Sequence, residues 1–196
     1  MGAVSNSLNF KERWELPTLV LVDMNNDQPS GTEADPGRKN FLAALEKCGT
    51  ALEHARQHGL PVAFVRHMSP STSFLATRAY PSWIGDIRPR RSDMIFERAF
   101  PSCYASSEFA QMAHHSGELV LAGLFGETSC LSTLVEGYGR CHVFTYLADA
   151  SFSRGVDGIS FDQVHRSVMG IASIYSEVST TQAWADRVSR KISMMG

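Results

Sequence analysis

A serine and a cysteine stand side by side in LAGLFGETSCLST, residues 121–133. An apolar run leads into a turn at Gly126, and Ser129 and Cys130 follow where a helix is expected to begin. The first N–H groups of a helix are unpaired and carry the positive end of its dipole, so they favour an anion. A cysteine there can have a lowered pKa and act as a thiolate nucleophile, and the same N–H groups can hold an oxyanion. The local sequence fits equally well a helix capped by Ser129 or Thr128, with Cys130 packed inward.

Three further groups capable of chemistry each end an apolar run. Asp23 ends TLVLVD, His67 ends PVAFVRH and Arg98 ends DMIFER. A carboxylate at a strand end can act as a general base, with a pKa set by burial and by neighbouring cations. Taken alone, Asp23 is better explained as the cap of a turn, and Arg98 as a surface side chain. Their importance depends on whether the fold brings them together.

Short apolar runs alternate with helical segments along the chain. The pattern predicts strands at 18–23, 61–67, 93–98, 118–123 and 141–150, with a short last strand at 177–181. It predicts helices from Asp35 to Gly59, from Phe109 to His115, from Leu131 to Tyr138, over 161–175 and around 182–192. This order is typical of an α/β fold with a parallel sheet covered on both faces. Ligands of such sheets bind beyond the carboxyl ends of the strands, where these chemically capable residues are expected.

The composition and the charge of the chain limit the classes of function that it can have. The chain has 196 residues, 43% of them hydrophobic and 19% charged, with a formal net charge of −2, as expected for one globular domain. Scattered charge gives no reason to expect nucleic acid as a partner, and no apolar run is long enough to cross a membrane. The first residues resemble no secretory signal, so we expect a cytoplasmic protein. The four cysteines form no C-x-x-C pair and are expected to be free thiols.

Several segments resemble the isochorismatase-like hydrolases, also called the cysteine hydrolase superfamily. TLVLVDMNNDQ is similar to that family's opening strand with its "LLVDMQNDF" signature, IFERAFPSCY to its "vxKxxySAF" segment, and LAGLFGETSCLST to its nucleophile corner. RQHGLPVAFVRH and VFTYLADASFS resemble further strands, so that the resemblance extends over nearly the whole chain. It implies a single three-layer αβα domain over residues 1–196, with a Rossmann-like, six-stranded, mostly parallel sheet.

The family's catalytic set is Asp, Lys and Cys, used to hydrolyse amides such as nicotinamide and carbamoyl compounds. By resemblance Asp23 matches the Asp, Arg98 stands where the family has Lys, and the spacing places Ser129 rather than Cys130 in the Cys position. A branch that includes isochorismatase lacks the Cys and cleaves a vinyl ether. Since arginine keeps its proton under working conditions, we expect Arg98 to lower the pKa of Asp23 and to stabilise an anion without transferring a proton.

Three hypotheses follow from the resemblance. The first is a hydrolase of a C–N bond, of amide or ureide type, in a small polar molecule. Asp23 would be its base, Arg98 its electrostatic stabiliser, Cys130 or Ser129 its nucleophile, and the N–H groups of both would hold the oxyanion. The second is ether hydrolysis without a covalent intermediate, in which Asp23 protonates a vinyl carbon. The third is a binding domain that has kept the pocket and lost the chemistry.

Other expectations concern the substrate and its surroundings. We expect substrate contacts from His67, Gln28, Trp83 and Phe125. Nicotinamidase-type relatives hold a metal with an Asp and several His near the first connection, whereas residues 24–60 here offer only two histidines inside a predicted helix. We therefore expect neither a metal nor another cofactor. The expected partner is a small-molecule substrate, and the expected assembly is a homodimer or a higher homo-oligomer.

Overall fold

The computed structural model describes residues 16–25, 36–68 and 82–195. Its centre is a six-stranded sheet in the order β3-β2-β1-β4-β5-β6, and every neighbouring pair of strands is parallel. The strands are β1 (Thr18–Val22), β2 (Val62–His67), β3 (Met94–Arg98), β4 (Leu119–Leu124), β5 (Phe144–Phe152) and β6 (Glu177–Ser179). The predicted α/β fold with a six-stranded parallel sheet is confirmed.

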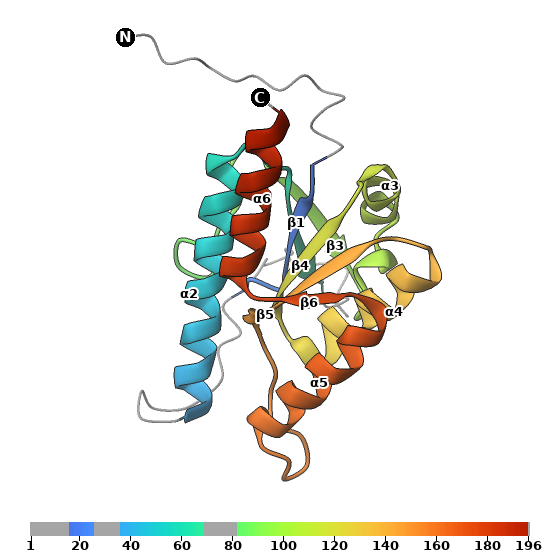
Figure 1. Cartoon of the computed structure of the whole chain (residues 1–196). Helices are drawn as coiled ribbons and strands as arrows, with labels where there is room; N and C mark the ends of the chain where they lie inside the picture. Colours follow the sequence, from blue (N-terminus) through green and yellow to red (C-terminus); the bar gives the residue numbers. More distant parts are fainter. Residues whose placement is uncertain (1–15, 26–35, 69–81, 196) are drawn as a thin grey trace.

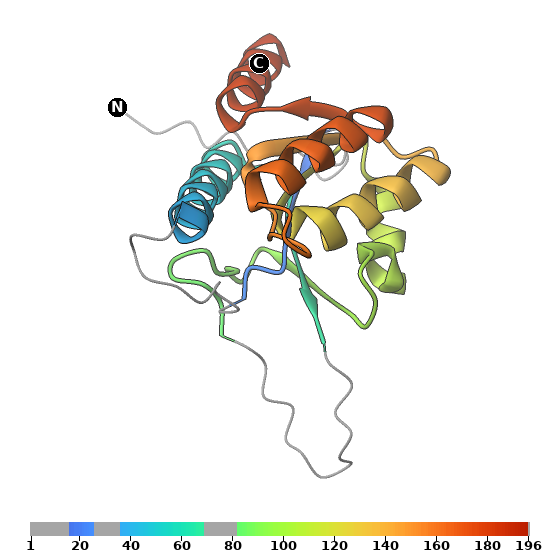
Figure 2. The same cartoon turned by 90° about the horizontal axis from the view of Figure 1, so that it is seen from below.

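Helices cover both faces of the sheet. They are α2 (Pro36–Gln57), α3 (Ser107–His115), α4 (Leu131–Gly139), α5 (Phe161–Tyr175) and α6 (Thr181–Met195), with short helical turns η1 (Cys103–Ala105) and η2 (Gly126–Cys130). Helices α2 and α6 lie side by side on one face, and α3, α4 and α5 cover the other (Figures 1 and 2). This gives the three expected layers. Strand β5 continues to Phe152, two residues beyond the predicted end.

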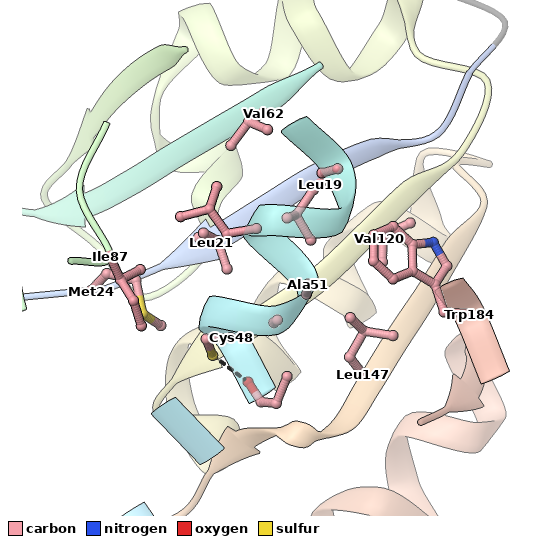
Figure 3. Close-up of a cluster of buried hydrophobic side chains, with 14 of the residues drawn as sticks. Leu19, Leu21, Met24, Cys48, Ala51, Val62, Ile87, Val120, Leu147 and Trp184 are labelled. Atoms are coloured by element: carbon pink, nitrogen blue, oxygen red, sulfur yellow. Dashed lines mark hydrogen bonds between the residues drawn. The ribbon is translucent and has the colours of Figure 1, made fainter. Parts of the chain in front are cut away.

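Strand β1 is buried along its whole length because it lies in the middle of the sheet with a helical layer on each side. Leu19 and Leu21 point into the core beneath α2 and α6, together with Cys48 and Trp184 (Figure 3). The thiol of Cys48 donates a hydrogen bond to the Ala150 carbonyl at 2.9 Å. The alternate residues of β1 face the second core under α3, α4 and α5. Burial on both faces fixes the register of β1 and therefore the position of the residue that follows it.

A glycine allows β1 and β4 to come together at their carboxyl ends. Gly123 of β4 stands opposite Val22 of β1 and has a φ of +135°. A Cβ atom at this position would lie 2.3 Å from the Val22 carbonyl oxygen, so no other residue fits without moving the strands. The next residues lead through a cis peptide bond between Leu124 and Phe125 into η2. The strand pair thus delivers Asp23 and the η2 turn to one edge of the sheet.

Candidate functional site

Three polar side chains from separate segments meet at the carboxyl edge of the sheet. Asp23 follows β1, Arg98 is the last residue of β3, and Ser129 lies in the η2 turn after β4. The Ser129 hydroxyl donates to Asp23 Oδ2 at 2.8 Å. Arg98 Nη2 donates to Ser129 Oγ at 2.8 Å and is also ion-paired with Asp23 Oδ2. A carboxylate, a hydroxyl and a guanidinium therefore form one closed triangle of hydrogen bonds.

The strand register explains how Arg98 reaches Asp23 across β2. His67 stands opposite Arg98 in the β2–β3 pair, and the His67 backbone N–H donates to Asp23 Oδ1 at 2.9 Å. Arg98 is 3% exposed, and its Nη1 donates to the Phe100 carbonyl at 2.6 Å. The guanidinium is thus fixed at both terminal nitrogens. Asp23 itself has a left-handed φ of 52°, which turns the chain out of β1 at this point.

Burial dominates the acidity of Asp23. Desolvation raises the pKa of its carboxyl above the ordinary value, and it outweighs Arg98, Ser129 and the His67 N–H, each of which favours the ionised form. Arg98 lowers the pKa of Asp23, as expected, but burial raises this pKa by more, so the net value lies above the ordinary one. A carboxylate with a raised pKa is a stronger base than an exposed one and gives back its proton less readily.

Cys130 does not join this cluster. Its side chain is fully buried in the core beneath α3, α4 and α5, and burial raises the pKa of its thiol well above the usual range. The Cys130 N–H donates to the Phe125 carbonyl at 3.2 Å, so it is already engaged. The expectations of a thiolate at Cys130, and of an oxyanion donor from its N–H, are contradicted by these contacts. The structure brings Ser129, rather than Cys130, to Asp23.

The four expected substrate contacts have different outcomes. His67 meets Asp23 through its backbone, and its side chain is exposed. Trp83 pairs with Asn25 in an isolated bridge, packs edge-on against Phe64 at 5.4 Å, and lies 5.3 Å from the Arg66 guanidinium. Gln28 lies outside the described residues. Through its bridge to Asn25, Trp83 is held beside the segment that follows Asp23.

Phe125, the fourth expected contact, precedes η2 and belongs to an arrangement that the sequence interpretation missed. The Arg154 guanidinium lies 3.9 Å from the centre of the Phe125 ring. Arg154 also donates from Nε to Glu127 Oε1 at 3.1 Å and from its backbone to Glu127 Oε2 at 3.3 Å. One arginine thus contacts both ends of the segment 125–127. The sequence offered one sign of this arrangement, namely that Arg154 follows shortly after the fifth predicted strand.

Neither a metal cluster nor a membrane helix is found in the part of the chain that the structure describes. No three His, Cys, Asp or Glu residues among residues 16–25, 36–68 and 82–195 gather closely enough to hold a metal ion. Within the same ranges, no helix combines the length and the apolar character needed to cross a bilayer.

Solved structures of similar fold come from several bacteria and an archaeon. An isochorismatase from Pseudomonas putida KT2440 superposes with a TM-score of 0.74 at 18% identity, covering 85% of this chain and 89% of the other. A cysteine hydrolase from Pseudomonas syringae pv. phaseolicola 1448A gives 0.74 at 20% identity, covering 88% and 92%. N-carbamoylsarcosine amidase from Thermoplasma acidophilum gives 0.64 at 21% identity, covering 84% and 96%. Identities this low establish a shared fold alone.

Sequence comparison establishes the family. No curated protein matches the sequence. The model of the isochorismatase domain, in contrast, matches residues 17–183, a stretch that runs from the start of β1 into α6 and includes Asp23, Arg98 and Ser129. Because this match covers most of the chain, the protein belongs to the isochorismatase family of hydrolases.

Proposed function

We propose that the protein hydrolyses a C–N bond, of amide or ureide type, in a small polar molecule, with Ser129 as the nucleophile. The observation that carries this proposal is the pair of hydrogen bonds on the Ser129 hydroxyl, one donated to Asp23 and one accepted from Arg98, each 2.8 Å long. A nucleophile needs a base that takes its proton and a charge that stabilises the oxygen formed, and these neighbours supply both. The N-carbamoylsarcosine amidase among the structural neighbours supports the choice of a C–N bond.

The chemistry would use two half-reactions. Ser129 Oγ attacks the substrate carbonyl while Asp23 accepts the hydroxyl proton, and the Arg98 charge stabilises the tetrahedral oxyanion. Asp23 then gives the proton to the leaving nitrogen as the C–N bond breaks, which leaves an ester on Ser129. Water attacks the ester, Asp23 takes its proton, and the Ser129 hydroxyl is restored. In this scheme Arg98 holds charge throughout without transferring a proton, because a guanidinium stays protonated.

A second candidate is vinyl ether hydrolysis of the isochorismatase type. It is favoured by the raised pKa of Asp23, since a carboxyl that holds its proton more tightly can be present in the acid form required to protonate a vinyl carbon. In that reaction Ser129 would not be attacked or acylated. It would only occupy the space beside the acid.

Intact-protein mass spectrometry during turnover separates these candidates. A panel of primary amides, ureides and isochorismate is given to the wild type, to Ser129→Ala and to the control Ser132→Ala, whose hydroxyl donates to the Thr128 and Ser129 carbonyls. The proposal expects an acyl mass increase in the wild type and the control, and loss of both the adduct and the activity in Ser129→Ala. Activity that survives in Ser129→Ala without an adduct overturns it in favour of the ether reaction. Ligand-induced thermal stabilisation without turnover would instead indicate a binding domain.

The homo-oligomer implied by the resemblance and the cytoplasmic location expected from the first residues both stay predictions. A homo-oligomer is supported by exposed apolar side chains near a surface groove of about 520 Å³, among them Tyr138 of α4, Val143 before β5 and Ile174 of α5. These side chains are 59%, 62% and 65% exposed, and contiguous apolar surface of this kind is typical of interaction sites. Light scattering in solution tests the oligomer, and fractionation tests the cytoplasmic location.

A further inference from the structure

A buried threonine joins the two segments that carry Arg98 and Ser129. Thr133 lies in α4 and is 0% exposed. Its Oγ1 donates to the Ser129 carbonyl at 2.7 Å and accepts the backbone N–H of Cys103 at 3.0 Å. Cys103 begins η1, which follows β3 and its last residue, Arg98. One hydroxyl group therefore connects the segment of the guanidinium to the residue that the guanidinium contacts.

The two hydrogen bonds of Thr133 differ in what they indicate. Threonines inside helices often donate to the carbonyl four positions earlier, so the bond to Ser129 alone is ordinary. The bond from Cys103 joins residues that are 30 positions apart. Cys103 is fully buried, and a buried backbone N–H costs free energy unless it has a partner. The side chain of Thr133 supplies that partner, which makes η1 depend on α4 at this point.

These bonds close a ring that includes the proposed nucleophile. Arg98 Nη2 donates to Ser129 Oγ at 2.8 Å, and Arg98 Nη1 donates to the Phe100 carbonyl at 2.6 Å. Phe100 lies between Arg98 and Cys103 in the chain, and the Cys103 N–H leads back to Ser129 through Thr133. The side chain and the main chain of Ser129 are thus both held by the segment that begins with Arg98. Movement of η1 relative to α4 would change the contact between Arg98 and Ser129.

Further contacts hold η1 against α4 without this hydroxyl. Tyr104 of η1 lies against Gly137 of α4, where an added Cβ would be 3.0 Å from the Tyr104 hydroxyl. The guanidinium of Arg140, which follows α4, lies 4.8 Å from the centre of the Tyr104 ring. Along the helix, both contacts are farther from Ser129 than Thr133 is. Loss of the Thr133 hydroxyl is therefore expected to loosen the end of η1 nearest Ser129 rather than to detach η1.

Thr145 provides a comparison with a buried threonine elsewhere in the fold. It is 1% exposed, and its Oγ1 likewise donates one hydrogen bond, to Glu118 at 2.6 Å, and accepts one, from Arg187 at 2.9 Å. It is the second residue of β5, so it lies near the amino ends of the strands, whereas Asp23 lies at their carboxyl ends. Thr145 thus matches Thr133 in burial and in hydrogen bonding without reaching the site.

We propose that Thr133 is a positioning residue whose hydroxyl holds Ser129 in contact with Arg98. The pair of bonds from Cys103 to Thr133 and from Thr133 to Ser129 forms a tether between η1 and η2. Its effect on the rate rests on the proposed function, because it acts through Ser129 as the nucleophile. A displacement of about 1 Å at a reacting group can lower a rate about 100-fold, so a tether of this kind is sufficient to control turnover.

Amide hydrogen exchange, measured by NMR at single residues of the full chain, tests the tether without a substrate. In the wild type the Cys103 amide is expected to be protected, because its partner is a buried hydroxyl. Thr133→Val replaces this hydroxyl with a methyl group and is expected to speed exchange of the Cys103 and Cys130 amides at least about 10-fold. Thr145→Val, the matched control, should leave both rates unchanged.

Two results of the exchange measurement would overturn the proposal. One is a Cys103 amide that exchanges in the wild type as fast as in an unfolded chain, which needs no variant to fold. The other is an unchanged rate at Cys103 in Thr133→Val.

Steady-state rates separate positioning from stability. On a substrate that the wild type turns over, Thr133→Val is expected to lower kcat at least about 10-fold and to leave KM within about 2-fold, because the hydroxyl does not contact the substrate. Thr133→Ser keeps the hydroxyl and is expected to recover most of the loss, whereas Thr145→Val keeps the wild-type kcat. An unchanged kcat in Thr133→Val, or an equal loss in Thr133→Ser, overturns the positioning role. Failure of the wild type to turn over any substrate, or turnover that survives Ser129→Ala, contradicts the proposed function instead, and the exchange rates then decide the proposal alone.

Discussion

Ser129 Oγ donates a hydrogen bond to Asp23 Oδ2 although 106 positions separate the two residues in the chain. The contact exists because β1 and β4 are neighbours in the sheet and end at the same level. The guanidinium of Arg98 completes the contact from the other side of β2. The charge and the geometry of this guanidinium can be separated by substitution.

Arg98→Lys is expected to preserve folding better than Arg98→Met while impairing activity. Lysine keeps the positive charge beside Asp23, but it lacks the planar fork that contacts Phe100 and Ser129 at once. Methionine leaves a mostly buried carboxylate without its cation, which costs about 3–5 kcal/mol. Urea unfolding at neutral pH measures the difference. Equal free energies of unfolding for the two variants would contradict an electrostatic role for Arg98.

The pH profile of hydrolysis is expected to depend on the protonation of Asp23. If Asp23 is a base, kcat/KM rises with pH as the carboxyl loses its proton, and because its pKa is raised, the rise lies above the ordinary value of 3.8. If Asp23 is the acid of an ether hydrolysis, kcat/KM falls across the same range. Initial rates over a pH series, on whichever substrate is turned over, measure the sign. A flat profile between pH 4 and 8, roughly the range in which a perturbed carboxyl titrates, would argue against both roles.

The rate at which each cysteine is alkylated is expected to depend on whether its side chain is exposed or buried. Cys141 is exposed, whereas Cys48, Cys103 and Cys130 are buried, and burial raises the pKa of Cys103 to about 12. Iodoacetamide at neutral pH should therefore label Cys141 first, and the other three only after unfolding. Peptide mass mapping before and after addition of denaturant measures this order. Rapid labelling of Cys130 in the folded protein would revive the thiol as a nucleophile.

Much of the fold could be predicted because a strand that is buried on both faces must be apolar at nearly every position. TLVLV is apolar at nearly every position since β1 has a helical layer on each face, and the prediction of a strand there holds. The predicted end of β5, Ala150, lies two residues before the observed one. The structure continues the strand to Phe152, which carries Arg154 to the segment before Ser129.

The choice between Ser129 and Cys130 depends on a local conformation that composition does not specify. Residues 126–130 form a wide π-helical turn, and such a turn holds one more residue than an α-helical turn and rotates the side chains that follow. The spacing used in the resemblance pointed to Ser129, but only the turn determines which side chain faces Asp23. The net acidity of Asp23 was likewise beyond the sequence, because it depends on how completely the folded chain excludes water.

Gly123→Ala is expected to damage both stability and activity through the contact between β1 and β4. The added Cβ would lie 2.3 Å from the Val22 carbonyl oxygen, in a backbone conformation with φ of +135° that alanine rarely adopts. Strain and overlap together are expected to cost on the order of 3 kcal/mol, and the strands must separate beside Asp23.

Gly170→Ala is the matched control, since Gly170 lies within α5 and its added Cβ would have no described atom within 4 Å apart from the backbone of its own helix. That change is expected to raise the free energy of unfolding by about 1 kcal/mol through helix propensity, and to leave hydrolysis unchanged. Urea unfolding and initial rates measure both variants. If Gly123→Ala were as active and as stable as the wild type, the close approach of these strands would not be what positions Asp23 against Ser129.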